Sequence, residues 1–161
     1  MTEQRFLTAI FCDDVRREEG NKLSYMGVYG TNLLVPEFPI VLPKLCIALQ
    51  MRTSPSPPKE VVFKLLRDDE LIAERQIAAS ALKKLPGVIE DARETSMQLV
   101  GTIFQIFPLQ LTGPCRFRAR AICDGQEFKG GTLAVDRLNV TVEHIEPKSG
   151  RRTSAQPARK K

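Results

Sequence analysis

Hydrophobic and polar residues alternate along this chain in short runs, which proline, glycine and acidic turns separate. The clearest run spans residues 115–123, where apolar and arginine side chains follow one another with a period of two. That period places the two kinds of side chain on opposite faces of a β-strand, so the run predicts a half-buried strand. Its inward face would carry Cys115, Phe117, Ala119, Ala121 and Cys123, and its outward face Arg116, Arg118 and Arg120.

A hairpin is predicted directly after this run. The dipeptide Asp124-Gly125 is typical of a two-residue type I′ turn, which would place Phe128 on the inward face of the returning strand. Continued without interruption, the same register would leave Leu133 and Val135 facing solvent. We therefore predict a β-bulge at Gly130-Gly131, because one extra residue there turns both side chains inward.

The whole pattern predicts the fold class. Strand-like runs span residues 5–15, 22–29, 44–52, 60–67, 71–76, 97–111, 115–123, 126–135 and 138–145. Polar residues 16–21 indicate a turn, and proline-rich residues 36–43 indicate an irregular connection or an edge. We expect an all-β fold, an antiparallel two-sheet sandwich of the immunoglobulin-like or C2-like kind. It would have seven to nine strands and at most one short helix, near residues 80–85.

Charge divides the chain into two parts. The 161 residues carry a formal net charge of +5, but residues 147–161 alone contain six basic residues and no acidic one. This end has no aromatic residue and no Leu, Ile, Val or Met, so it cannot bury enough apolar surface to offset the entropy of ordering. We predict a β-sandwich domain over residues 1–146, which is close to neutral, and a disordered basic tail over residues 147–161.

Composition and cysteine usage indicate the compartment. Apolar residues make up 42% and charged residues 27%, as in ordinary globular domains. No run approaches the roughly 18 apolar residues of a membrane span, and residues 1–15 lack the features of a signal peptide. The four cysteines form no C-x-x-C pair, and His144 is the only histidine. We expect a cytoplasmic protein with reduced, buried cysteines, without metal or cofactor; a disulfide framework or a cysteine nucleophile is the alternative.

Several segments together resemble a known family. They are residues 11–15 (FCDDV), 22–30 (KLSYMGVYG) and 35–39 (VPEFP), followed by Pro114, Phe117, Arg118, Asp124-Gly125, Leu133 and Val135. Their order resembles a family of small bacterial β-sandwich proteins known as a domain of unknown function, over about residues 5–136. The resemblance implies the fold, and it implies no activity and no catalytic residue.

Two acidic clusters could hold calcium or magnesium through carboxylate oxygens. They are Asp13-Asp14 with Glu18-Glu19, and Asp68-Asp69-Glu70. Neither has the spacing of a calcium-binding loop, and Arg16 and Arg17 lie inside the first cluster. We interpret both clusters as solvated turns.

Basic residues are the remaining binding candidates. The three arginines on the outward face of residues 115–123 could bind phosphate, nucleic acid or an acidic partner, or they could form an ordinary solvated sheet face. The tail could dock on nucleic acid by counterion release, or serve only solubility. The possible anion or nucleic-acid contacts are Arg116, Arg118, Arg120, Lys148, Arg151, Arg152, Arg159, Lys160 and Lys161.

The sequence contains neither a phosphate-binding glycine loop nor a recognisable pair of nucleophile and base. We therefore expect a non-enzymatic β-sandwich interaction module that binds another protein, with no membrane partner. Open sheet edges would allow a homo-oligomer. The alternative is a nucleic-acid-associated accessory protein that uses the basic C-terminal tail.

Overall fold

Eleven strands make up most of the structure, a computed structural model that describes residues 5–53, 58–82 and 98–139. They are β1 (Phe6–Glu18), β2 (Lys22–Val28), β3 (Asn32–Val35), β4 (Ile40–Leu42), β5 (Leu45–Thr53), β6 (Glu60–Arg67), β7 (Glu70–Ala78), β8 (Gln98–Ile106), β9 (Leu109–Leu111), β10 (Cys115–Cys123) and β11 (Gln126–Arg137). A 3-10 turn (Glu19–Asn21) joins β1 to β2, and the short helix α1 (Ala79–Leu82) follows β7.

The expected all-β fold is confirmed, with more strands than the seven to nine expected. The additional strands are short, because β4 forms inside the proline-rich connection and Pro108 separates β9 from β8. The first strand is longer than predicted and includes residues 16–18, which the sequence indicated as part of a turn. The predicted helix at residues 80–85 is described as far as Leu82, and the last predicted strand, at residues 138–145, as far as Asn139, where no strand is formed.

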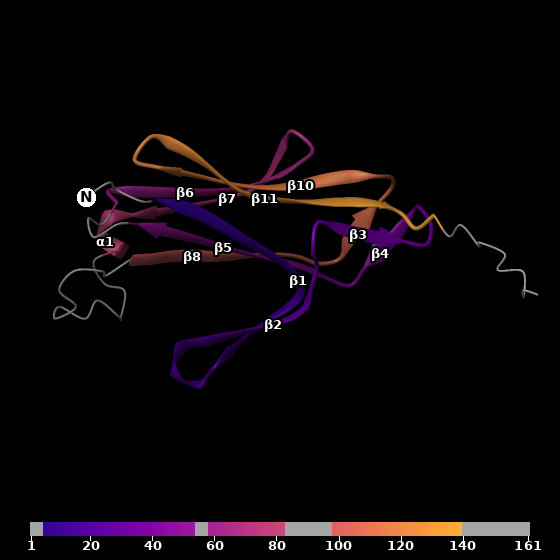
Figure 1. The fold of residues 1–161 in the computed structure, drawn as a ribbon, viewed down its shortest axis with the longest axis horizontal. Helices are drawn as coiled ribbons and strands as arrows, with labels where there is room; N and C mark the ends of the chain where they lie inside the picture. The colour runs from indigo at the N-terminus through magenta and orange to yellow at the C-terminus, as the bar shows by residue number, and fades with distance from the viewer. Residues whose placement is uncertain (1–4, 54–57, 83–97, 140–161) are drawn as a thin grey trace, which may run out of the picture.

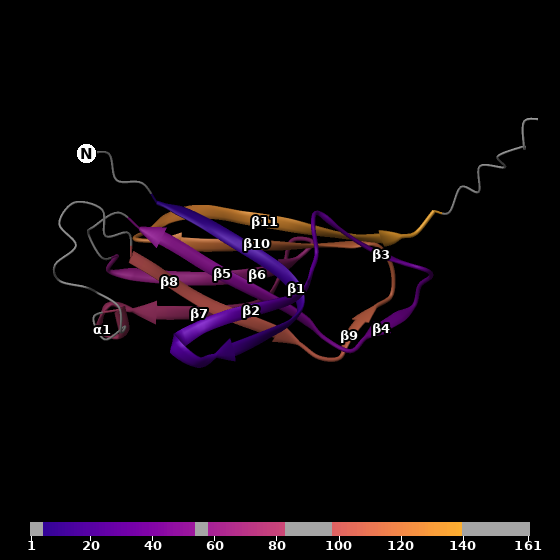
Figure 2. The same ribbon diagram turned by 60° about the horizontal axis from the view of Figure 1, so that its bottom comes forward.

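The strands form three sheets. One sheet has the order β2-β1-β5-β8, the second has the order β3-β11-β10-β6-β7, and β4 pairs with β9 in a small third sheet. The two larger sheets lie one above the other in Figure 1, and Figure 2 shows the β4–β9 pair beyond one end of them. All pairs are antiparallel as predicted, except β3 with β11, which is parallel.

The hydrophobic core lies between the two larger layers. The five predicted inward residues of β10 are all buried, and Phe63, Leu133 and Val135 pack in the same cluster. The burial agrees with the alternation of apolar and polar residues in the sequence, because each strand contributes one apolar face to the core between the two sheets.

The predicted bulge in β11 is confirmed. Ala119 pairs with Gly131 while Arg120 pairs with Lys129, so Gly130 is the extra residue that turns Leu133 and Val135 inward. A Cβ atom on Gly130 would lie only 2.7 Å from Cγ of Leu7 in β1. Gly130 therefore allows β11 and β1, which belong to different sheets, to approach closely at this side of the molecule.

Two aspartates at hairpin turns tie strand ends together. Asp68 and Asp124 both have positive φ, at 55° and 48°. The carboxylate of Asp68 accepts one backbone N–H hydrogen bond, from Arg116, and that of Asp124 accepts two, from Lys59 and Glu60. Burial alone would raise the pKa of Asp124, but hydrogen bonds from Arg5 and from the N–H groups of Glu60 and Lys59 lower it. The acidic cluster at residues 68–70 is thus a turn, as predicted.

The four cysteines are buried, and no disulfide links them, which agrees with the expected reduced, buried thiols. Within the residues that the structure describes, no helix has the length and apolar character needed to cross a membrane.

Replacing Gly130 with alanine should lower the free energy of unfolding by about 1–2 kcal/mol, since the new methyl group meets Leu7 and the close approach of β1 and β11 is lost. Urea denaturation followed by circular dichroism measures this. Gly113→Ala is the matched control, because nothing lies within 4 Å of its Cβ position, and it should change stability by less than about 0.5 kcal/mol. Equal effects of the two substitutions would contradict the packing role of Gly130.

Candidate functional site

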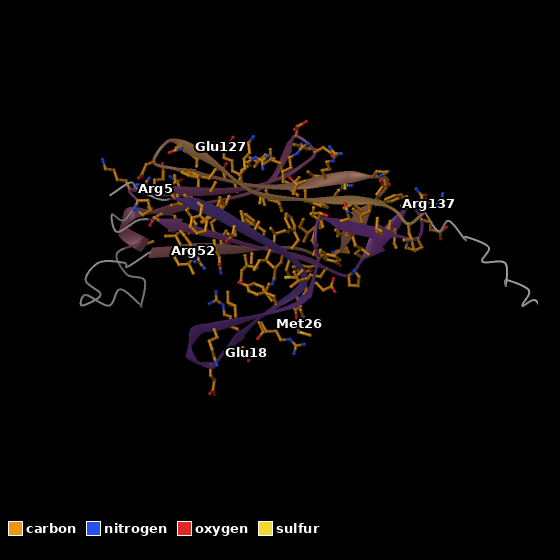
Figure 3. The ribbon with its side chains drawn as sticks, viewed as in Figure 1. Arg5, Glu18, Met26, Arg52, Glu127 and Arg137 are labelled. Atoms are coloured by element: carbon orange, nitrogen blue, oxygen red, sulfur yellow. The ribbon has the colours of Figure 1, made fainter. Side chains whose placement is uncertain are left out.

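The longest strand, β1, takes part in two different pairings. Residues 6–12 pair with β5, and residues 12–18 pair with β2, so Cys12 belongs to both ladders. The β1–β2 hairpin, residues 12–28, leaves the plane of its sheet and turns back along the outer side, away from the five-stranded layer (Figures 1 and 2). Figure 3 shows Glu18 and Met26 on this hairpin, below the two layers.

The hairpin covers part of the sheet from outside. Cys46 and Ala48 of β5 point away from the core, since their neighbours Leu45, Ile47 and Leu49 point into it, yet they are only 0% and 2% exposed. Gln50, the next outward residue, donates a hydrogen bond to the hydroxyl of Tyr25 in β2, at 3.1 Å. The inner face of the hairpin is therefore held against the outer face of β5.

Three residues from the motifs that resemble the family lie where the hairpin leaves the plane of the sheet, namely Asp13, Gly27 and Tyr29. Gly27 has φ of +62°, and a Cβ atom there would lie 2.0 Å from an oxygen of Asp13. The same aspartate accepts a hydrogen bond from the hydroxyl of Tyr29. Burial and this acidic partner raise the pKa of Tyr29, so the hydroxyl keeps the proton that it donates. The carboxylate thus fits only because position 27 has no side chain.

At the same point, two buried thiol groups donate hydrogen bonds to backbone carbonyl groups. Cys12 donates to the carbonyl of Asp14 at 3.4 Å, and Cys46 donates to the carbonyl of Asp13 at 3.6 Å. Burial raises the pKa of Cys12 to about 11 and also raises that of Cys46, so both sulfurs carry hydrogen at neutral pH. Outside, the ammonium group of Lys44 donates to Asp14 and lowers the pKa of that carboxyl group.

A groove remains between the hairpin and strand β8. It consists of two adjoining cavities of about 360 and 560 Å³, which share Arg17, Arg75 and Ile103. Val15, Arg17, Leu23 and Tyr25 form the wall on the hairpin side, and Val15 and Arg17 pair with Tyr25 and Leu23, so that all four lie on one face. The sheet side is formed by Ala48, Leu49, Gln50, Leu99, Gly101, Thr102, Ile103, Phe104 and Gln105, and Phe107 lies just beyond the end of β8.

The groove is positively charged. Arg17 comes from the hairpin and Arg75 from β7, the edge strand of the other sheet, and both are exposed. The described lining residues include no aspartate or glutamate, and no described carboxylate forms an ion pair with either arginine. A partner that supplies negative charge would therefore meet cations that have no competing carboxylate among the described residues.

Apolar side chains are exposed along the same groove. Leu99 is 49% exposed and Phe107 is 70% exposed, at opposite ends of β8. Burial of such side chains in a complex removes apolar surface from water, which favours association. Charge and exposed apolar surface thus occur together, as is typical of interaction sites.

The predicted arginine ladder lies elsewhere. Arg116, Arg118 and Arg120 lie on the outer face of the five-stranded sheet, on the other side of the molecule from the groove. Arg118 pairs with Asp69 at 2.7 Å, and Arg120 donates to a backbone carbonyl of its own strand. The ladder is therefore partly engaged within the protein. The predicted contacts Lys148, Arg151, Arg152, Arg159, Lys160 and Lys161 lie outside the described residues, as does His144.

The acidic clusters do not converge on a metal-binding arrangement. Within residues 5–53, 58–82 and 98–139, no group of three or more His, Cys, Asp or Glu side chains could hold a metal ion. Asp13 and Asp14 are engaged with Tyr29 and Lys44, and Glu18 lies at the far end of the hairpin (Figure 3).

Sequence reasoning missed Arg17, Tyr25 and Arg75 as site residues. One signal was available for Arg75, because it stands between Ala73 and Ile77 at the position of β7 that pairs with Phe63 and faces the core side. A charged side chain on the core-facing side of a strand is unusual, and it indicates that the strand lies at the edge of its sheet. For Arg17 no comparable signal exists, because its place depends on the hairpin folding back over the sheet.

Replacing Gly27 with alanine should lower the free energy of unfolding by about 2 kcal/mol, because the left-handed backbone conformation is strained for alanine and the methyl group collides with Asp13. The chain has two tyrosines and no tryptophan, so intrinsic fluorescence reports on Tyr25 and Tyr29 alone. The fluorescence transition in urea should shift to lower concentration.

Gly30→Ala is the control, because nothing lies within 4 Å of its Cβ position. It should leave the fluorescence transition within about 0.5 kcal/mol of the original. If Gly27→Ala behaves like Gly30→Ala, the contact between Asp13 and Gly27 does not fix the hairpin.

Comparison with known proteins gives one match. No curated protein and no solved structure matches the chain. A family model described as "Family of unknown function (DUF6941)" matches residues 7–136, which include the hairpin, the groove and both large sheets. This agrees with the span of the resemblance found from the sequence. The chain therefore belongs to this family of unknown function, DUF6941.

Proposed function

We propose that this protein is a non-enzymatic β-sandwich interaction module that binds another protein through the groove between the β1–β2 hairpin and β8. In this proposal the two larger sheets form the sandwich, of the immunoglobulin-like or C2-like kind, and the β4–β9 pair extends one end. The buried, unlinked cysteines suit a reducing compartment, which supports the cytoplasm as its place of action.

One observation carries the proposal, namely the composition of the groove. Exposed apolar side chains, a tyrosine hydroxyl and two arginines line one continuous depression, and the described lining residues supply no carboxylate. Apolar surface favours association in general, and the arginines select partners that carry negative charge. Both are properties of a binding surface rather than of a reaction centre.

Affinity capture from a lysate of the source organism tests this function, with the full chain as bait. The double variant Arg17→Glu, Arg75→Glu should lose at least about tenfold of the captured partner, since each substitution replaces attraction with repulsion at the groove. Arg116→Glu is the matched control, because this exposed arginine lies on the outer face of the opposite sheet. Its capture should equal that of the original chain.

The proposal fails if the double variant retains the same proteins as the original chain. Circular dichroism of both variants is a necessary companion measurement, and it should match that of the original chain. Both groove arginines are exposed, so their replacement removes no core packing.

A second candidate function is an accessory role on nucleic acid through the basic C-terminal tail. It is favoured by the six basic residues of residues 147–161, which could release counterions from phosphates. Among Arg116, Arg118 and Arg120, Arg118 already forms an ion pair with Asp69, which leaves the tail as the main basic element.

Deletion of residues 147–161 tests this second candidate. Binding of the full chain to a labelled DNA duplex of 30 base pairs should weaken steeply as the salt concentration rises, and the truncated chain should not bind. Salt-insensitive absence of binding by the full chain would exclude this role.

A further inference from the structure

Strand β8 lies beside the groove at the edge of its sheet, and no other described strand pairs with its outer side. It is the last strand of its sheet, and its only pairing partner among the described residues is β5. Alternate residues of such a strand present N–H and C=O groups that another strand can pair with. The nine residues of β8 include no charged residue and no proline.

The neighbouring edge strand, β7, has features that discourage pairing with other chains. β7, at the same side of the other sheet, carries Glu70, Glu74 and Arg75, and its pairing with β6 shifts register at Leu65/Leu66. Charges and bulges are the usual devices that keep an edge from pairing with other chains. β8 has neither, since its ladder with β5 is continuous from Leu45 to Thr53.

We propose that β8 accepts an extended, acidic segment of the partner protein as an added strand, whose carboxylates pair with Arg17 and Arg75. This rests on the proposed function and specifies the partner's chemistry. Backbone hydrogen bonds to the edge would supply affinity, and alternate side chains would supply specificity. One set of side chains enters the groove, where Arg17 and Arg75 line both cavities, and the other set lies on the opposite face of the added strand.

The charge of the groove decides which segment fits. The described lining residues carry two cations and no anion, so a basic segment would be repelled, and a purely apolar one would leave both guanidinium groups covered without a partner. In a segment that alternates acidic with β-branched residues, all the acidic side chains lie on one face and can reach both cations, and the β-branched residues favour the extended conformation. At about 3.3 Å per residue, eight residues span most of β8.

The test titrates the ¹⁵N-labelled full chain with an eight-residue peptide in which Glu and Val alternate. Binding should shift the amide resonances of β8 and of the hairpin, with a dissociation constant of about 1 mM or tighter. Arg17→Glu and Arg75→Glu should each weaken binding about tenfold, while Arg116→Glu leaves it unchanged. The same peptide with Lys in place of Glu should not bind.

Backbone methylation separates strand addition from charge attraction. Two versions of the peptide carry N-methyl groups on alternate residues, one version along each edge. The version methylated on the edge that faces β8 should lose at least about tenfold in affinity, because its N–H groups can no longer donate, while the other binds like the parent peptide.

Equal affinities of the two methylated versions would overturn strand addition, and absence of binding at millimolar peptide would overturn the proposal as a whole. A free chain that is a dimer in sedimentation, and that Arg17→Glu dissociates, would overturn it in favour of a second copy at this edge. If capture depends on the groove but no peptide binds, the proposed function stands and this inference falls. If capture does not depend on the groove, the proposed function itself falls.

Discussion

The fold-back of β1 at Cys12 is the constraint on which the rest of the outer surface depends. The first half of β1 pairs with β5 and the second half pairs with β2 on its other edge, and the exchange takes place at a single residue of the same sheet. Backbone carbonyl groups at such a change of partner are stabilised when side chains donate hydrogen bonds to them. The thiols of Cys12 and Cys46 donate such hydrogen bonds to the carbonyls of Asp14 and Asp13. The cysteines thus have a structural role that their apolar sequence context did not indicate.

The edge strands β7 and β8, at one side of the molecule, differ in the features that control pairing with other chains. β7 has charges and an irregular register, whereas β8 has an uncharged and regular ladder. A regular edge strand of nine residues without a charged side chain is an aggregation hazard in an isolated protein. The arginine that β7 directs toward its inner side reaches the groove beside β8, so protection of one edge also supplies charge to the other. The same feature that limits indiscriminate pairing by repelling basic segments favours pairing with acidic ones.

The sequence determined local structure well and long-range placement poorly. Strand β10, the type I′ turn and the bulge at Gly130 were predictable, because alternation and parity act between residues that are close along the chain. Strand β4 was not predictable from the proline-rich segment, because its existence depends on β9, which follows far later in the chain. The groove was missed for the same reason. Its walls come from the hairpin, β5, β7 and β8, and no local pattern records that the hairpin lies over β5.

In the proposed complex, the position of charge matters more than its quantity for the choice of partner. The sequence has a pI near 9.2, and its excess basicity lies in residues 147–161, because residues 1–146 are close to neutral. Arg17 and Arg75 add only two charges, but they border a depression from which a bound strand would exclude water. The Coulomb attraction between a carboxylate and a guanidinium group is several times stronger at the lower dielectric constant of such a site. In the proposed complex, the two cations beside the edge of β8 would therefore contribute directly to the choice of partner.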